Sequence, residues 1–210
     1  MDYSQFFNMI PEAGLMAILV IVFLADLFMK GEKKHTTLSM LTCVLLVAQV
    51  VLCFNAQPAE AFAGLYTATA AAQVMKVILT AGAFIVVVMA QSWIEREDVL
   101  RKEGEFYELV ISTLLGMYMM ISSGHFLMFF LGLEMASVPM ACLVAFDKYK
   151  KNSAEGAAKF VLTATFSSGV MLYGISFLYG ACGTLYFDDV AAKISASPLT
   201  IMGLVFFFSG

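Results

Sequence analysis

The stretch Phe126-Leu-Met-Phe-Phe-Leu-Gly-Leu-Glu134-Met-Ala-Ser-Val-Pro-Met-Ala-Cys-Leu-Val-Ala-Phe146 decides the fold class of this chain. A transmembrane helix needs about 20 apolar residues, and this run is long enough and carries a single charge. That charge, Glu134, lies about 18 Å from the Phe146 end of the helix, near the centre of a bilayer. A carboxylate at that depth costs roughly 2.5–3.5 kcal/mol on insertion scales, so we treat Glu134 as a candidate site for moving a proton or an ion.

The composition of the whole chain agrees with this stretch. The 210 residues are 61% hydrophobic and only 13% charged, about half the charge of an ordinary soluble domain. The four cysteines have no metal-ligand spacing, and no glycine-rich phosphate-binding loop is present. We therefore expect a polytopic protein whose partner is the lipid bilayer, with no metal, nucleotide or nucleic acid bound to this chain.

Six apolar runs are long enough to cross a bilayer, and a seventh begins near the end of the sequence. The six are 9–29, 37–54, 72–93, 106–122, 126–146 and 154–179, and the seventh begins at Pro198. Segments 55–71 and 181–197 are predicted to be loops. We expect an all-α polytopic membrane protein with six transmembrane helices plus the start of a seventh, a fragment that stops inside a helix at Gly210.

The basic residues predict the orientation of these helices. Nine of them fall in the three loops on one side: Lys30, Lys33, Lys34, Arg96, Arg101, Lys102, Lys148, Lys150 and Lys151. Only Lys193 falls in a loop on the other side. Cytoplasmic loops are enriched in Lys and Arg. We therefore expect these three loops in the cytoplasm and the N-terminus outside, in the periplasm if the source is bacterial.

Lys159 is the second charge that draws attention, about 8 Å into the sixth run. Glu155 precedes it by four residues, the favourable order for an ion pair on a helix surface. That pair would be an ordinary interfacial contact. Thr163 and Ser167 continue the same helix face inward, however, which suits a hydrated path for protons. The residues alone leave both interpretations open.

Other charges near the run ends have simpler explanations. Asp26 fits a solvated helix end close to Lys30. Lys76 lies near the outside end of the third run, where a long side chain that reaches water explains it as well as a functional role does. Glu12 follows a proline at a helix start and is expected to be structural. His125 is expected at the membrane interface rather than as a ligand, and a histidine there is able to titrate near neutral pH.

Pro139 changes the backbone next to Glu134. Proline has no N–H, so the carbonyl of Met135 loses its helical partner, and Gly132 adds local freedom. Unsatisfied backbone at membrane depth needs protein or water around it. A carboxylate beside a loosened, hydrated helix is typical of a proton relay. The alternative is a protonated Glu134 that is hydrogen-bonded to a neighbouring helix.

Several motifs between residues 105 and 187 carry a family resemblance. They are Glu105-Phe-Tyr-Glu-Leu109, Phe130-Leu-Gly-Leu-Glu-Met-Ala-Ser-Val-Pro139, Ser153-Ala-Glu-Gly-Ala-Ala-Lys-Phe160 and Gly183-Thr-Leu-Tyr-Phe187. The sequence resembles the antiporter-like membrane subunits of the proton-translocating NADH:quinone oxidoreductase, respiratory complex I, and among them most resembles subunit N. The second and third motifs are specific, whereas the apolar runs around them are not.

The resemblance implies an antiporter-like inverted-repeat fold truncated in its first half. Residues 1–104 would hold the first three helices, and residues 105–210 the start of the proton-translocation module. Glu134 would be the fifth-helix glutamate that pairs with a lysine on the seventh helix, beyond Gly210. Lys159 would line the cytoplasmic entry path. These two residues are our candidate catalytic residues for proton translocation.

The resemblance also implies the setting. The chain would be a multi-pass protein of the cell inner membrane, beside other antiporter-like subunits and small membrane subunits of complex I. NADH and quinone would be used by the whole complex and bound by other subunits. Two alternatives remain: a subunit of a multisubunit sodium/proton antiporter, and a non-catalytic scaffold subunit of a respiratory complex.

Overall fold

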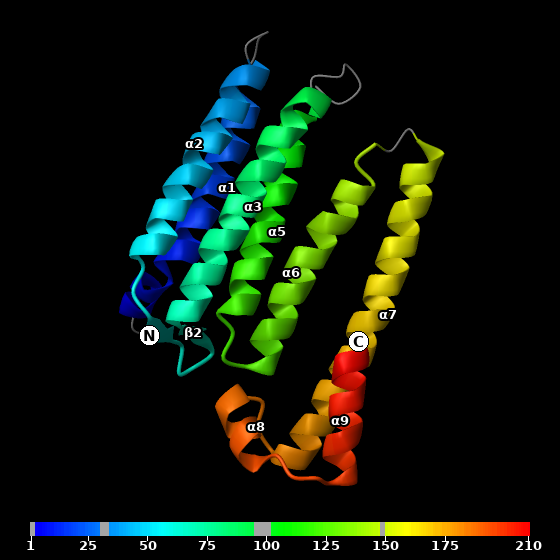
Figure 1. Cartoon of the computed structure of the whole chain (residues 1–210). Coiled ribbons are helices and arrows are strands. Elements are labelled where there is room, and N and C mark those ends of the chain that lie inside the picture. The colour runs from blue at the N-terminus through cyan, green and yellow to red at the C-terminus, as the bar shows by residue number, and fades with distance from the viewer. Residues whose placement is uncertain (1–2, 30–33, 95–101, 148–149) are drawn as a thin grey trace.

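The computed structural model describes residues 3–29, 34–94, 102–147 and 150–210, which form a bundle of helices with one small β-hairpin (Figure 1). The helices are η1 Tyr3–Met9, α1 Ile10–Phe28, α2 Lys34–Asn55, α3 Ala70–Ile94, α5 Glu103–Ile121, α6 Phe126–Val144, α7 Lys151–Cys182, α8 Phe187–Lys193 and α9 Pro198–Ser209. The strands are β1 Ala59–Ala61 and β2 Tyr66–Ala68.

The predicted runs are all found as helices. Five of the described helices (α1, α2, α3, α6 and α7) are long and apolar enough to cross a membrane. The fourth predicted run is α5, a helix of 19 residues that carries Glu103, Glu105 and Glu108 in its first two turns. The seventh run is α9, a helix of 12 residues. The predicted all-α membrane fold is therefore confirmed.

Helix α5 lies at the centre of the bundle, where it contacts α1, α3 and α6. The main core joins α1, α2, α3 and α5 through fully buried side chains such as Leu15, Leu46, Val87 and Ile111. A second core links α6 and α7 to the last two helices. Helix α9 turns back and runs along α7 (Figure 1).

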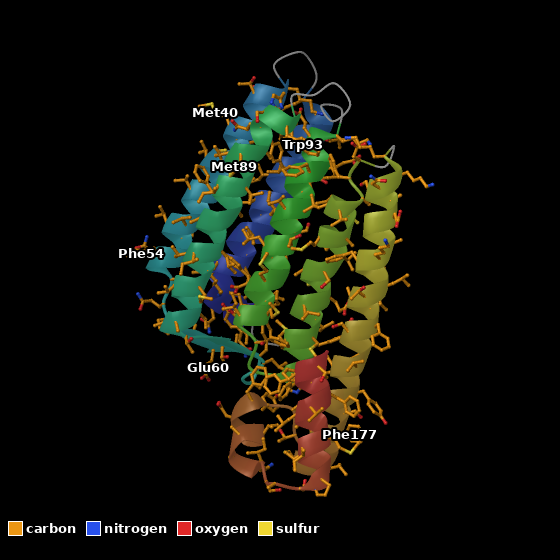
Figure 2. All side chains as sticks on the ribbon, turned by 45° about the vertical axis from the view of Figure 1, so that its right-hand side comes forward. Met40, Phe54, Glu60, Met89, Trp93 and Phe177 are labelled. Atoms are coloured by element: carbon orange, nitrogen blue, oxygen red, sulfur yellow. The ribbon has the colours of Figure 1, made fainter. Side chains whose placement is uncertain are left out.

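The outer surface of the bundle is apolar. Figure 2 shows Met40, Phe54 and Met89 pointing away from the helices that carry them, and these side chains are 68%, 81% and 73% exposed. Apolar side chains that face outward on long helices are what a lipid environment requires.

The two predicted loops on one side contain structure that the sequence did not reveal. Segment 55–71 holds the antiparallel pair β1–β2, closed by a turn in which Phe62, Ala63 and Gly64 all have positive φ. Such angles are uncommon for residues with a Cβ. Segment 181–197 holds the short helix α8.

The basic residues are unevenly divided between the two ends of the bundle. We call the end that carries Lys34, Lys102 and Lys150 the basic end, and the end that carries the hairpin and α8, with Lys193, the hairpin end. Lys151 also lies at the basic end. The remaining basic residues of the predicted cytoplasmic loops lie outside the described residues: Lys30, Lys33, Arg96, Arg101 and Lys148.

Candidate functional site

Glu134 lies in the middle of α6, about 12 Å along the helix from Phe126. Its side chain is half-buried and lines a groove of about 640 Å³ between α6 and α7. Apart from Glu134, the polar residues of the groove are Ser137, Cys142 and Thr165. The carboxylate is therefore placed between two membrane-spanning helices rather than on the far side of α6.

The Glu134 carboxylate makes no hydrogen bond or ion pair with any residue that the structure describes. The nearby Ser137 hydroxyl donates instead to the carbonyl of Leu133, at 2.8 Å. The predicted alternative of a Glu134 hydrogen-bonded to a neighbouring helix is thus not found in the described part of the chain. An apolar groove that holds one unpaired carboxylate suits the binding of a proton or of a cationic partner.

Helix α6 continues without a break through Pro139. The predicted loosening is thus limited to the one hydrogen bond that a proline cannot donate. The carbonyl that loses this bond belongs to Met135, the residue next to Glu134. The structure adds a tight contact here, because a side chain at Gly132 would collide with the backbone of Met120 on α5.

Lys159 lies apart from Glu134. It is not among the residues of the groove, and its ammonium pairs with the Glu155 carboxylate at 2.6 Å on the outer face of α7. Both side chains are largely exposed, at 74% and 57%. Thr163 donates to the Lys159 carbonyl, and Ser167 donates to the carbonyl of Gly210. The described residues therefore show the ordinary ion pair, and no contact joins the two candidate residues.

A second group of charges, whose members the sequence analysis interpreted separately, lies at the hairpin end. Lys76 on α3 is 0% exposed, and its ammonium bonds the Glu12 carboxylate of α1 at 2.6 Å. Tyr66 on β2 donates to the other Glu12 oxygen at 2.9 Å, and Ser122 after α5 donates at 3.2 Å. We call Glu12, Tyr66, Lys76 and Ser122 the Glu12–Lys76 cluster.

The interpretation in which Lys76 reaches water is therefore wrong. Its ammonium is enclosed by the Glu12 carboxylate and by the rings of Tyr66 and Tyr118, whose centroids lie 5.4 and 5.6 Å away. A buried ammonium needs such a partner, because an unpaired one is costly. Glu12 is structural, as predicted, but through this pair rather than through its helix end alone.

Burial and the neighbouring Glu12 carboxylate raise the pKa of the Tyr66 phenol, which therefore stays protonated and can donate. Further polar contacts extend inward from the cluster. The Tyr118 hydroxyl forms a hydrogen bond with the Thr80 hydroxyl. It forms a second one with the Cys53 thiol, at 3.1 Å. Gln49 donates to the Pro11 carbonyl at 2.6 Å. These contacts join α1, α2, α3 and α5.

One sequence signal was available for this cluster. Gln73, Lys76 and Thr80 lie at positions i, i+3 and i+7 of an otherwise apolar helix, so they share one face. All three are buried. A polar face on a transmembrane helix indicates a buried partner, but the sequence cannot say that the partner is Glu12.

Charged side chains also meet at the basic end, among them Asp26, Asp147 and Glu103. Asp26 pairs with Lys34 at 2.9 Å, whereas the predicted partner Lys30 lies outside the described residues. His35 lies 2.5 Å from the carboxylate of Glu103, which is 2% exposed. Asp26 is thus held at a helix end, as predicted, although it is paired rather than simply solvated.

His125 caps α6. Its Nδ1 accepts a hydrogen bond from the backbone N–H of Leu127 at 3.2 Å, and its ring packs edge-on against Tyr186. Burial lowers the pKa of His125 from its ordinary value near 6.5. The imidazole is therefore neutral at pH 7, and its role is to begin the helix that carries Glu134.

Metal-binding clusters are not found in the described ranges: no group of three or more His, Cys, Asp or Glu side chains is placed to hold an ion.

Relatives of known sequence match the chain over its whole length. It is 51% identical over 210 residues to NADH-quinone oxidoreductase subunit N of Phocaeicola vulgatus, and 43% identical over 212 residues to subunit N of Azobacteroides pseudotrichonymphae. In both comparisons 100% of this chain and 44% of the relative are covered. The chain thus spans under half the length of these curated relatives.

Solved structures match the fold. Respiratory complex I from Thermus thermophilus contains a chain that matches 95% of this one with a TM-score of 0.78 at 24% identity, and 42% of that chain is covered. An archaeal membrane-bound sulfane sulfur reductase contains one that matches 96% with a TM-score of 0.75 at 18% identity, and 43% of that chain is covered.

The family described as NADH:quinone oxidoreductase/Mrp antiporter, TM, matches residues 123–210. This range includes Glu134 and Lys159 but not Glu12, Tyr66 or Lys76. Together with the full-length matches above, it means that the chain belongs to the NADH-quinone oxidoreductase subunit N family of antiporter-like membrane proteins.

Proposed function

We propose that this chain is part of a membrane subunit of a proton-translocating NADH:quinone oxidoreductase, which couples electron transfer from NADH to quinone with proton movement across the membrane. The observation that carries the proposal is the unpaired Glu134 carboxylate in the groove between two membrane-spanning helices. The full-length similarity to subunit N supports it.

Glu134 would act by changing its protonation state. A cation near a carboxylate favours the ionised form, and its departure favours the protonated form. At about 4 Å and an effective dielectric constant near 20, one unit charge is worth about 4 kcal/mol. A lysine brought to the groove by another helix would therefore drive proton release from Glu134, and its withdrawal would drive proton uptake.

Lys159 would serve the entry of protons at the basic end. Its ion pair with Glu155 is exposed and formed by flexible side chains, so it costs little to open. Thr163 and Ser167 continue inward from it on α7. We keep Lys159 as a proposed entry residue, separate from the groove.

The setting follows from the charge distribution. The basic end would face the cytoplasm and the hairpin end the periplasm, across the inner membrane. The exposed apolar faces of the helices would contact lipid and the neighbouring antiporter-like and small membrane subunits. NADH and quinone would bind to other subunits.

The test is a Glu134→Gln variant in the complete subunit within the assembled complex. We expect NADH:quinone turnover to persist while the number of protons moved per electron pair falls, because glutamine cannot exchange a proton. Glu60→Gln is the matched control, since Glu60 is exposed at the hairpin end. Normal pumping by a fully assembled Glu134→Gln complex would refute the proposal.

The same variant separates the scaffold alternative. If Glu134 only held helices together, Glu134→Gln would reduce the amount of assembled complex and leave the protons moved per complex unchanged.

A second candidate is a subunit of a sodium/proton antiporter, because the matched family is described by both activities. Proton movement that requires sodium, and that is independent of NADH and quinone, would favour it. Pumping in sodium-free buffer favours the first proposal.

A further inference from the structure

We propose that the Glu12–Lys76 cluster is a positioning unit for Glu134. It fixes the end of α5 and the turn that begins α6, and it thereby sets where Glu134 lies in the groove. This inference rests on the proposed function of Glu134. It assigns a role to residues outside the range 123–210 that the family match covers.

The first step is the hold on α5. Ser122 directly follows the last residue of α5 and donates to the Glu12 carboxylate at 3.2 Å. Lys76 and Tyr66 donate to the same carboxylate, at 2.6 and 2.9 Å. The end of α5 is therefore tied to α1, α3 and β2 through one buried charge.

The second step is the hold on the turn before α6. The Thr67 N–H donates to the Ser122 carbonyl at 2.8 Å, and the Gly124 N–H donates to the Leu65 carbonyl at 2.9 Å. A side chain at Gly124 would collide with the carbonyl oxygen of Gly64. The hairpin thus contacts the turn backbone directly, and Tyr66 connects that hairpin to Glu12.

The close contact between α5 and α6 links the end of α5 to the location of Glu134. Side chains at Gly116 on α5 and Gly132 on α6 would each collide with the backbone of the opposite helix. Gly116 faces Met135 and Ala136, the two residues after Glu134. The backbones of α5 and α6 are therefore in contact on both sides of Glu134.

Between α1 and α6 the described residues leave a space along this length. An apolar cavity of about 410 Å³ lies there, bordered by Glu12, Tyr66, Met128 and Met135 among others. On this side the location of α6 therefore depends on α5 and on the turn, which the cluster holds, while α7 and α9 pack against its other side.

The hydrogen bonds of Glu12 favour a role in holding the helices together over a role in proton transfer. Both of its oxygens already accept hydrogen bonds, from one ammonium and two hydroxyls. Removing one partner of a buried ion pair leaves an uncompensated charge, whereas replacing both partners with neutral groups of similar shape is often tolerated. Glutamine at position 12 still offers an oxygen to Tyr66 or Ser122.

The test compares Lys76→Met with the double variant Glu12→Gln/Lys76→Met, in the complete subunit within the assembled complex. Lys193→Met is the control, since Lys193 is exposed on α8. The readouts are protons moved per electron pair in assembled complexes, and hydrogen exchange of α6 amides. In Lys76→Met we expect the protons moved per electron pair to fall by about threefold or more. We expect the hydrogen-exchange rate of the α6 amides to rise by a similar factor. In the double variant we expect both to recover to within about twofold of the parent protein.

Three results would overturn the inference. One is a Lys76→Met variant that lowers only the amount of complex, with pumping per complex and α6 exchange unchanged. Another is a double variant that assembles but stays as defective as Lys76→Met. The third is amide hydrogen exchange that, in Lys76→Met, rises only in α1 and α3. Because exchange of α6 does not depend on proton movement, it tests positioning even if Glu134→Gln pumps normally and the proposed function fails.

Discussion

Two glutamates in apolar helices, Glu12 and Glu134, have opposite surroundings. Glu12 is 3% exposed and accepts hydrogen bonds from Lys76, Tyr66 and Ser122. Glu134 accepts none from the residues whose placement is described. A carboxylate with all its partners in place serves to hold helices, whereas one without partners is available to a proton or a mobile cation.

Tyr66→Phe tests the hydrogen bonding of Glu12. The ring remains, but the buried carboxylate loses one donor, which costs about 1–3 kcal/mol of unfolding free energy. We expect a lower thermal midpoint for the purified complete protein in detergent. Tyr179→Phe is the control, since Tyr179 is 55% exposed, and it should leave the midpoint unchanged. Equal midpoints for Tyr66→Phe and the parent would show that the Tyr66 hydroxyl contributes nothing.

His125 gives a pH dependence. Its folded-state pKa is lowered, so the unfolded chain binds a proton first as pH falls below about 6.5. Stability is therefore unaffected above that pH and decreases below it. Protonation of Nδ1 also removes the acceptor for the Leu127 N–H.

His125→Asn separates this effect from other titrations. Asparagine caps a helix without titrating, so we expect the loss of stability between pH 7.5 and 5.5 to be smaller in the variant, measured by thermal unfolding at both pH values. An identical loss in His125→Asn would assign the effect to another group.

At the scale of elements, the contact between α5 and α6 is the closest approach near Glu134. Gly116→Ala would push the new methyl group into the backbone of Met135 and Ala136. Overpacking of this kind costs about 1–3 kcal/mol. We expect less assembled complex and weaker pumping per complex.

Gly82→Ala is the matched change on α3, where a Cβ meets nothing within 4 Å. Alanine is favoured over glycine in a helix by about 1 kcal/mol, so this variant should assemble normally. If Gly116→Ala also assembled and pumped normally, the helices would not be as close as described.

The elements themselves were largely predictable. Apolar length alone located α1, α2, α3, α6 and α7, because each must span a bilayer. The hairpin was not predictable from its strands of three residues, since its turn depends on residues with positive φ and on backbone contacts with the turn after α5.

The candidate site was predictable only in part. The position of Glu134 in an apolar run predicted its depth, and the structure adds the groove. The environment of Lys76 was misjudged because its partner Glu12 is 64 residues away in the sequence. The position of a residue near a helix end indicates its contacts with nearby residues only. The roles of Glu134 and Lys159, and the division of the chain at residue 104, stay predictions.

At the scale of the whole molecule, most charged residues lie in the loops and at the helix ends, and the long helices between them expose apolar side chains. Lys150 and Lys151 are at the basic end, and Lys193 is at the hairpin end. An amine reagent that cannot cross the membrane should label Lys193 in cells with a permeabilised outer membrane. It should label Lys150 and Lys151 only in inverted vesicles. The reverse pattern would overturn the proposed orientation.

In the proposed function, Glu134 gains and loses a proton during turnover. The most direct measurement is an infrared difference spectrum of the protonated carboxyl group in the assembled complex, recorded with and without NADH and quinone. We expect a carboxyl band that disappears in Glu134→Gln and persists in Glu60→Gln. A band that is unchanged in Glu134→Gln would contradict it.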